Sequence, residues 1–265
     1  MDKTVELVNS VKDIHAMPSV IVKALNIMKK PTASMKELGD IVMFDQSLTI
    51  KILALVNSAY YGFSQQISSI NIALSLLGMV KVKNIIVAVA MKPMMSNAGD
   101  KELWKHSMRG AAGCEYLANL TKVTDSDEAF ISGFVHDVGK IVLHMSNEKL
   151  YDKVLKAVSD GADILDAEKK YYESDHVKTG SLLAKRWQLP ILLANIISYH
   201  HAPSLSSIPV PCNLVSLIDK VVQTEFNPNS VDKDFIKSLG IDFEDLQDLR
   251  EAVLQKAEVL ISELN

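Results

Sequence analysis

The hydrophobic residues of this chain recur with helical spacing along almost its whole length. Leu7, Val8, Val11 and Ile14 form a first apolar stripe, and residues three or four positions apart lie on one face of an α-helix. Similar stripes continue to Leu264. No stretch alternates apolar and polar residues between turn signals, as a half-buried strand would. The pattern therefore predicts an all-α protein with more than ten helices.

Capping residues and glycines predict where several of these helices begin and end. Met17-Pro18 ends the first stripe, and Ser19 can cap a second helix. Ser34-Met35-Lys36-Glu37 has the capping-box pattern of a helix start. Gly78 stops a later helix. The next helix, from Val82 to Met91, is nearly all apolar, which predicts burial on every side.

The clearest break in the chain is Ser96-Asn97-Ala98-Gly99-Asp100, where small and polar residues cluster as they do in loops. We therefore expect residues 1–98 to form an N-terminal helical part and residues 99–225 to form a second half that carries the chemistry. Residues 226–265 are expected to add a C-terminal helical extension. The N-terminal helices should pack as a layer on the second half.

Composition and charge narrow the class of protein. Hydrophobic residues make up 48% and charged residues 23% of the chain, and the net charge is −4 with lysines and arginines dispersed. This argues against nucleic acid or an anionic membrane as the main partner. Cys114 and Cys212 are far apart in sequence and form no CxxC motif, which fits a reducing compartment. We found no signal-peptide pattern and no apolar run of roughly 18 residues, so a cytoplasmic location is expected.

The segment Gly133 to Lys140, with the sequence GFVHDVGK, places polar groups inside an otherwise apolar helical pattern. His136 and Asp137 are adjacent, and Lys140 follows three residues after Asp137, on the same helical face. An imidazole and a carboxylate both bind metals, and neither is stable in an apolar wall without a partner. A buried, hydrogen-bonded His–Asp pair is the alternative explanation.

Further histidines and carboxylates fall where one site could collect them. Glu102 and His106 are four residues apart and share a helix face. His176 lies in the first turn of a predicted helix, and His200-His201 ends another. Asp219 stands among apolar residues and calls for a partner. Together, imidazoles and carboxylates from several helices can hold two divalent metals about 3.5–4 Å apart.

Each of these side chains also has an ordinary structural explanation. The alternatives are a solvated helix pair for Glu102 and His106, a cap or surface position for His176, a helix-dipole partner for His200-His201, a solvated amine for Lys140, and an ion pair with Lys220 or Lys185 for Asp219.

The ligand order resembles the metal-binding signature of the HD superfamily, and most closely the ligand set of the HD-GYP cyclic-dinucleotide phosphodiesterases. The motifs that carry this resemblance are Glu102…His106, His136-Asp137-x-x-Lys140, His176, His200-His201 and Asp219. The N-terminal half, together with motifs of the second half, is similar to the HDOD family, the HD-related output domain of bacterial signalling proteins. That similarity rests on Met17-Pro18, Asp45 to Thr49, Asn57-Ser58-Ala59-Tyr60-Tyr61-Gly62, Ala73 to Gly78, Gly180 to Pro190 and His200-His201-x-Pro203. It covers roughly residues 15 to 225.

The resemblance implies an HD-like helical bundle, a metal site and residue roles. Two divalent ions (Fe, Mn, Ni, Zn or Mg) would be held by Glu102, His106, His136, Asp137, His176, His200, His201 and Asp219. Asp137 would bridge the ions and act in catalysis with Lys140, and Lys140 and Arg109 would neutralise a substrate phosphate.

Two functions follow from the resemblance. One is a metal-dependent phosphohydrolase or phosphodiesterase that acts on a phosphorylated small molecule or nucleotide. The other is a non-catalytic signalling adaptor that acts through protein partners, since many HDOD members have lost metal ligands. After His200-His201 the chain reads Ala202-Pro203-Ser204-Leu205. The HD-GYP group has Glu-x-x-Asp-Gly-x-Gly-Tyr-Pro there, and this departure argues against cyclic-di-GMP as the substrate.

Overall fold

A computed structural model of the chain describes residues 2–11, 21–23, 34–97 and 101–264. These residues form helices and no strand, which confirms the all-α prediction. The α-helices are α1 (Lys3–Ser10), α3 (Met35–Phe44), α4 (Gln46–Val56), α5 (Ile70–Asn97), α6 (Lys101–Thr121), α7 (Ser126–Val135), α8 (Gly139–Ser146), α9 (Glu148–Ser159), α10 (Ile164–Tyr172), α11 (His176–Arg186), α12 (Ile191–Tyr199), α13 (Pro209–Val221), α14 (Lys233–Ser238) and α15 (Leu246–Leu264). Short 3₁₀ turns are η2 (Pro203–Leu205), η3 (Pro228–Ser230) and η4 (Phe243–Asp245). The predicted helix start at Ser19, the stop at Met17-Pro18 and the last three residues of the predicted break, 98–100, lie outside the described residues.

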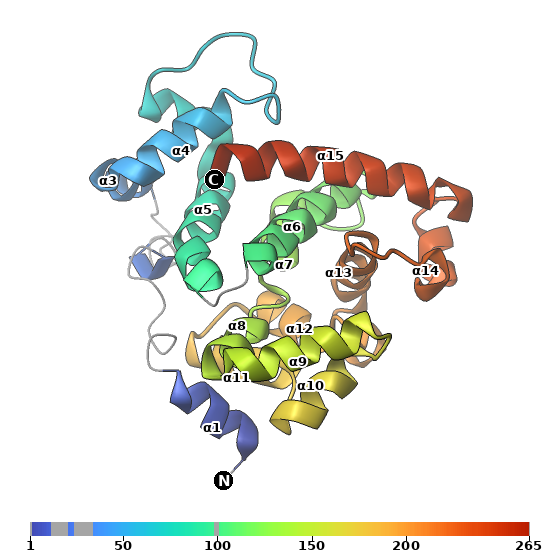
Figure 1. Cartoon of the computed structure of the whole chain (residues 1–265). Coiled ribbons are helices and arrows are strands. Elements are labelled where there is room, and N and C mark those ends of the chain that lie inside the picture. Colours follow the sequence, from blue (N-terminus) through green and yellow to red (C-terminus); the bar gives the residue numbers. More distant parts are fainter. Residues whose placement is uncertain (1, 12–20, 24–33, 98–100, 265) are drawn as a thin grey trace.

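Helices α3, α4 and α5 lie together at one end of the molecule (Figure 1). The predicted capping box at Ser34 is confirmed, because Ser34 and Glu37 satisfy each other's backbone N–H groups. Asp45 ends α3 and caps α4 by accepting a hydrogen bond from the backbone N–H of Leu48. The predicted stop at Gly78 is a kink within α5, where φ is 79° and ψ is 164°. Only glycine adopts this conformation without strain.

Part of α5, Ile70–Met95, is long and apolar enough to cross a membrane by length and composition. Half of its most apolar window is buried inside the protein, and Gly78 interrupts the helix. A core helix passes the same test. The segment is the core helix of the N-terminal layer, which packs against α3, α4, α6 and α7.

Helices α6 and α7 form the centre of the fold (Figure 1). One side of α6 faces α5, where Trp104 and Met108 are fully buried. The other side faces α13 and α15. Because α6 contacts α5 on one side and α13 and α15 on the other, residues at different positions along it can take part in different sites.

The C-terminal helix α15 crosses α6 and ends beside α4 and α5 (Figure 1). Its apolar stripe, which includes Val253, Ala257 and Leu260, is buried. Lys51 and Lys92 donate hydrogen bonds to the carbonyl oxygen of Leu264. Residues beyond 225 thus close the core over α6.

Helices α8 to α12 form the opposite end, and α1 packs against α8 and α11 there. The Thr4 and Ser174 hydroxyls are buried and lie 2.9 Å apart. Ser174 is two residues before His176, so α1 supports the loop from which that histidine emerges.

Candidate metal centre

His136 and Asp137 lie in a short turn between two helices, not within one helix as their apolar surroundings predict. Helix α7 ends at Val135 and α8 begins at Gly139. In the turn, the backbone N–H groups bond three residues back, from Val138 to Val135 at 3.0 Å and from Lys140 to Asp137 at 2.9 Å. The tighter turn redirects the chain.

Two glycines let α6 and α7 touch backbone to backbone. A Cβ atom added to Gly133 would lie 2.3 Å from the carbonyl oxygen of Gly110, which no side chain tolerates. His106 precedes Gly110 by one turn, and His136 follows Gly133 by three residues. The close helix contact therefore brings their imidazoles together, with the Nε2 atoms 3.3 Å apart.

A third glycine joins α8 to α11. A Cβ atom on Gly139 would lie 1.9 Å from the carbonyl oxygen of His176 and 2.6 Å from the backbone nitrogen of Gly180. The start of α8 therefore abuts the first turn of α11. This contact places Asp137 beside His176, whose Nε2 atom lies 3.3 Å from Asp137 Oδ1.

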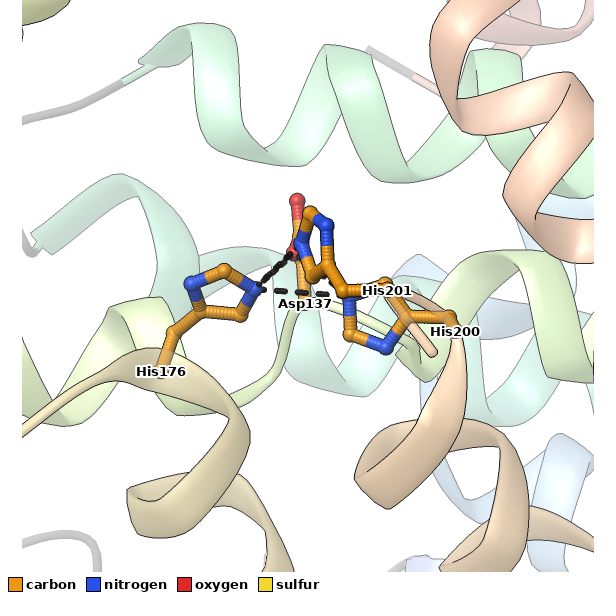
Figure 2. A group of neighbouring side chains, drawn as sticks. All are labelled: Asp137, His176, His200 and His201. Carbon is orange, nitrogen blue, oxygen red and sulfur yellow. Dashed lines mark hydrogen bonds and ion pairs between the residues drawn. The ribbon is translucent and has the colours of Figure 1, made fainter. Parts of the chain in front are cut away.

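Seven of the eight side chains predicted as metal ligands converge in two groups that share Asp137. Within each group, one possible ligand atom per residue lies within 4.8 Å of all the others. The His136 and His200 rings, from different helix ends, have centroids 5.1 Å apart. Figure 2 shows the second group around Asp137. The first group is His106, His136, Asp137 and Asp219, and the second is Asp137, His176, His200 and His201.

The two oxygens of Asp137 face different groups. Oδ2 lies 3.2 Å from His106 Nε2 and 3.3 Å from His136 Nε2. Oδ1 lies 3.3 Å from His176 Nε2 and 3.6 Å from His200 Nε2. Asp137 is completely buried. A carboxylate in this position can serve as a ligand to two ions at once.

The hydrogen bonds of three imidazoles fix which ring nitrogen carries the proton. Nδ1 of His136 lies 2.8 Å from the Gly133 carbonyl oxygen, and Nδ1 of His200 lies 3.0 Å from that of Ile196. Carbonyl oxygens only accept hydrogen bonds, so Nδ1 donates and, in the neutral ring, Nε2 keeps its lone pair. Nδ1 of His176 donates in the same way to Glu168. The Nε2 lone pairs are therefore directed into the site.

The Nε2 lone pairs of His176 and His200 face each other and cannot satisfy one another, and Nε2 of His201 can donate a hydrogen bond to only one partner. His176 Nε2 is 3.3 Å from His200 Nε2 and 3.0 Å from His201 Nε2. Asp137 Oδ1 is buried and accepts no hydrogen bond from the described residues. Electron-rich atoms that converge in this way repel each other unless a cation lies between them, so the residues fit a divalent metal.

Glu168 on α10 is a functional candidate that the sequence reasoning missed. Its Oε2 atom accepts hydrogen bonds from the backbone N–H of His176 at 2.8 Å and from Nδ1 of the same residue at 2.7 Å. The glutamate is completely buried. Its burial could have been predicted from the sequence, because Glu168 lies four residues from both Ile164 and Tyr172, on the inward face of its helix.

The electrostatics of the first group favour positive charge. Burial opposes protonation of His136, but the Asp137 and Asp219 carboxylates outweigh it and raise the pKa of His136 to about 10, so a metal ion would replace the proton on its Nε2 atom. Burial would raise the pKa of Asp137, yet the His136 and Lys140 cations hold it well below its ordinary value. In the second group, burial and the imidazoles of His200 and His176 lower the pKa of His201 to about 2.

The other three residues predicted for the site, Lys140, Glu102 and Arg109, are not among the seven converging side chains. Lys140 Nζ donates a hydrogen bond to Asp137 Oδ2 at 2.5 Å, and its side chain is 17% exposed. Glu102 lies outside both groups, and its carboxylate pairs with Lys105 at 2.7 Å. The guanidinium of Arg109 faces the Glu258 carboxylate at 3.1 Å and Glu102 at 3.8 Å. The described contacts of Arg109 thus place it against carboxylates.

The family model of the HDOD domain matches residues 14–203, more than two thirds of the chain. The chain belongs to the HDOD family. A curated relative from Treponema pallidum (strain Nichols), described as an uncharacterized protein, is 23% identical over 204 residues, which is 74% of this chain and 39% of the relative. The chain spans about two fifths of the length of the curated relatives it matches.

Solved structures of similar proteins support the HDOD fold over the whole chain. An HDOD domain protein of unknown function from Geobacter sulfurreducens has a TM-score of 0.82 at 20% identity, with 98% of this chain and 97% of that chain covered. A Shewanella amazonensis SB2B protein named "Putative phosphohydrolase" has a TM-score of 0.74 at 20% identity, with 98% of each chain covered. At these identities the likeness shows the fold.

Proposed function

We propose that this HDOD protein binds two divalent metal ions and hydrolyses a phosphate ester at them. The observation that carries the proposal is the position of Asp137, which directs one oxygen into each group of ligands. One ion would be held by His106, His136, Asp137 and Asp219. The second would be held by Asp137, His176, His200 and His201.

The donor set favours transition metals over magnesium. The second group offers three imidazoles and one carboxylate. Imidazole nitrogen suits Zn, Fe and Ni, whereas Mg prefers oxygen ligands and retains water. Fe, Ni or Zn therefore fits this group better than Mg, and the first group, with two carboxylates, accepts a wider range that includes Mn.

A bound metal pair would supply a nucleophilic water and charge stabilisation for the phosphoryl group. The protein would supply the positioning. Lys140 and His106 are partly exposed, with side chains 17% and 20% accessible, whereas His136 and His176 are fully buried. A phosphate would therefore approach past Lys140. The Asp137 carboxylate raises the pKa of Lys140, so its ammonium is charged and can donate to a phosphate oxygen.

Two experiments test this function. Metal analysis of freshly purified protein should give up to two ions per chain. The loaded protein should then hydrolyse bis-p-nitrophenyl phosphate or p-nitrophenyl phosphate. Lys140→Met should keep the metal and lower turnover by about 10²–10³-fold. The matched control is Lys153→Met, which changes an exposed lysine on α9. Protein without bound metal after loading would refute the proposal.

A specific observation favours the second candidate, a non-catalytic signalling adaptor. Several large apolar side chains on α3, α4 and α5 face solvent, and Phe44 is 93% exposed. Exposed apolar residues that gather on neighbouring helices mark protein-binding surfaces. Metal-loaded protein that turns over no phosphoester would favour the adaptor, with the metal in a structural role.

A further inference from the structure

A cleft of about 370 Å³ opens away from the metal centre, where the segment after α4 meets α5, α6 and α15. Its volume lies in the range of small-molecule pockets. Glu115, which lines the cleft, is nine residues along α6 from His106, or about 13 Å at the rise of an α-helix. The cleft is lined by Tyr60, Tyr61, Lys81, Glu115, Tyr116 and Lys256, among others. The Tyr60-Tyr61-Gly62 motif therefore has a place in the structure that the metal centre does not explain.

The side chains of the inner wall of the cleft form a network of hydrogen bonds and ion pairs. The Tyr60 hydroxyl donates to Glu115 Oε2, and Lys81 Nζ lies 2.7 Å from Glu115 Oε1. Lys81 also pairs with Asp127 at 3.1 Å. Because both Glu115 oxygens already accept hydrogen bonds, this carboxylate offers a ligand no free acceptor. The network holds the wall rigid.

Lys256 on α15 supplies positive charge at the cleft. Its ammonium lies over the rings of Tyr60 and Tyr116, at 5.3 and 5.7 Å from their centroids. Within the residues that the structure describes, no carboxylate pairs with it. The two cation–π contacts fix the position of the ammonium, so it is ready to bind an anion.

The other side chains of the cleft offer ring faces and unused polar groups. The Tyr61 and Tyr116 hydroxyls and the Asn119 amide make no hydrogen bond to the described part of the chain. Tyrosine rings provide flat apolar surfaces for stacking, and since Lys256 lies over Tyr60 and Tyr116 and Phe63 stacks on Tyr61, a ligand ring would stack on the other face of one of these rings. An amide at the rim can both donate to and accept from the edge of such a ring.

We propose that this cleft binds a small anion that carries a flat ring, a ligand of the nucleotide class. Lys256 would bind the anionic group, the tyrosine rings would stack on the ligand ring, and Asn119 would bond its edge. The site uses none of the metal-ligand residues and is independent of the phosphohydrolase function.

The test uses the full chain and AMP as the probe in isothermal titration calorimetry. AMP should bind saturably, and adenosine and ribose 5-phosphate should each bind more weakly. Lys256→Gln should weaken AMP binding at least about tenfold, the effect of one charge-assisted hydrogen bond. Tyr116→Leu should weaken it about tenfold, because it removes both a stacking surface and one of the two rings that hold the Lys256 ammonium. Lys149→Gln changes an exposed lysine on α9 and should leave AMP binding unchanged.

The variant Asp137→Ala distinguishes AMP binding in the cleft from AMP binding at the metal centre. The proposal requires this variant to bind AMP as the wild type does. Absence of AMP binding to the wild type would overturn the proposal. So would binding that is lost in Asp137→Ala but unchanged in Lys256→Gln, since the nucleotide would then occupy the metal centre. Equal affinity for AMP and adenosine would show that Lys256 binds no anionic group.

Discussion

One carboxylate oxygen of Glu168 accepts hydrogen bonds from both the backbone N–H and Nδ1 of His176, at 2.8 and 2.7 Å. The two bonds hold the first residue of α11 and its ring in one orientation. They also fix the proton on Nδ1, so that Nε2 is directed at Asp137 as a lone pair. Glu168 is thus a positioning residue for the second group of proposed ligands.

Glu168→Gln should weaken metal binding by about 10–100-fold, because the amide of glutamine is a weaker acceptor and orients His176 less firmly. Calorimetric titration with Mn²⁺ or Zn²⁺ measures the change. Asp166→Asn is the matched control on the same helix, since the side chain of Asp166 is 79% exposed. Unchanged affinity in Glu168→Gln would mean that His176 is not a ligand, or that Glu168 does not position it.

Asp137→Ala and His106→Ala should differ in how much metal they lose. Asp137 faces both groups, so its removal should abolish binding of both ions. His106 belongs to the first group alone, so His106→Ala should leave the second ion bound. Metal analysis of the two variants after identical loading gives the count. If Asp137→Ala retains the wild-type metal content, this aspartate is only a buried hydrogen-bonding residue.

Gly139→Ala should destabilise the fold by about 1–3 kcal/mol, since its methyl group would collide with backbone atoms of α11 that cannot move independently. Denaturant unfolding measures the loss. Gly39→Ala is the control, because its nearest neighbour is the flexible tip of Leu74 at 3.1 Å. This variant should stay within about 1 kcal/mol of wild type. Equal losses in the two variants would contradict the inferred backbone contact.

Removal of metal should lower the thermal midpoint. A ligand at a hundred times its dissociation constant stabilises the native state by about 2.7 kcal/mol. For a chain of this size, that corresponds to a shift on the order of 5–10 °C. Differential scanning calorimetry with Mn²⁺ and with excess EDTA makes the comparison. Asp137→Ala should show no such shift, and a shift equal to that of the wild type would place the stabilising metal elsewhere.

The sequence predicts the helical class from its local apolar pattern, and it predicts the convergence of most site residues from their ligand chemistry and the resemblance of their order to the HD signature. Histidines at helix ends, such as His176 and His200, could be placed from caps and apolar stripes. The turn at His136 could not, since the residues on both sides are buried and the apolar pattern continues through it. The change from backbone hydrogen bonds four residues back to hydrogen bonds three residues back does not alter the apolar pattern.

Residues four apart share a helix face, yet Glu102 and His106 have different surroundings. His106 borders the buried contact with α7 and turns toward the site. Glu102, one turn earlier, is near the start of α6 and pairs with Lys105. Glu102 was predicted as a ligand and lies outside the site, whereas Glu168 was not predicted and lies beside it. A lone glutamate on an amphipathic helix is usually solvated, so its spacing alone was no reason to place Glu168 at the site. Its partner is supplied by tertiary packing that no local spacing reveals.

The match to the family model ends at residue 203, before α13, although Asp219 on that helix completes one of the two groups. A fragment that ends at residue 203 would keep six of the seven converging side chains and lose Asp219. It would also lose α15 and expose the apolar surface of α6 that this helix covers. Recombinant fragments of this protein should therefore extend through Leu264, because Asp219 and the helix that covers α6 both lie beyond the residues that the family model matches.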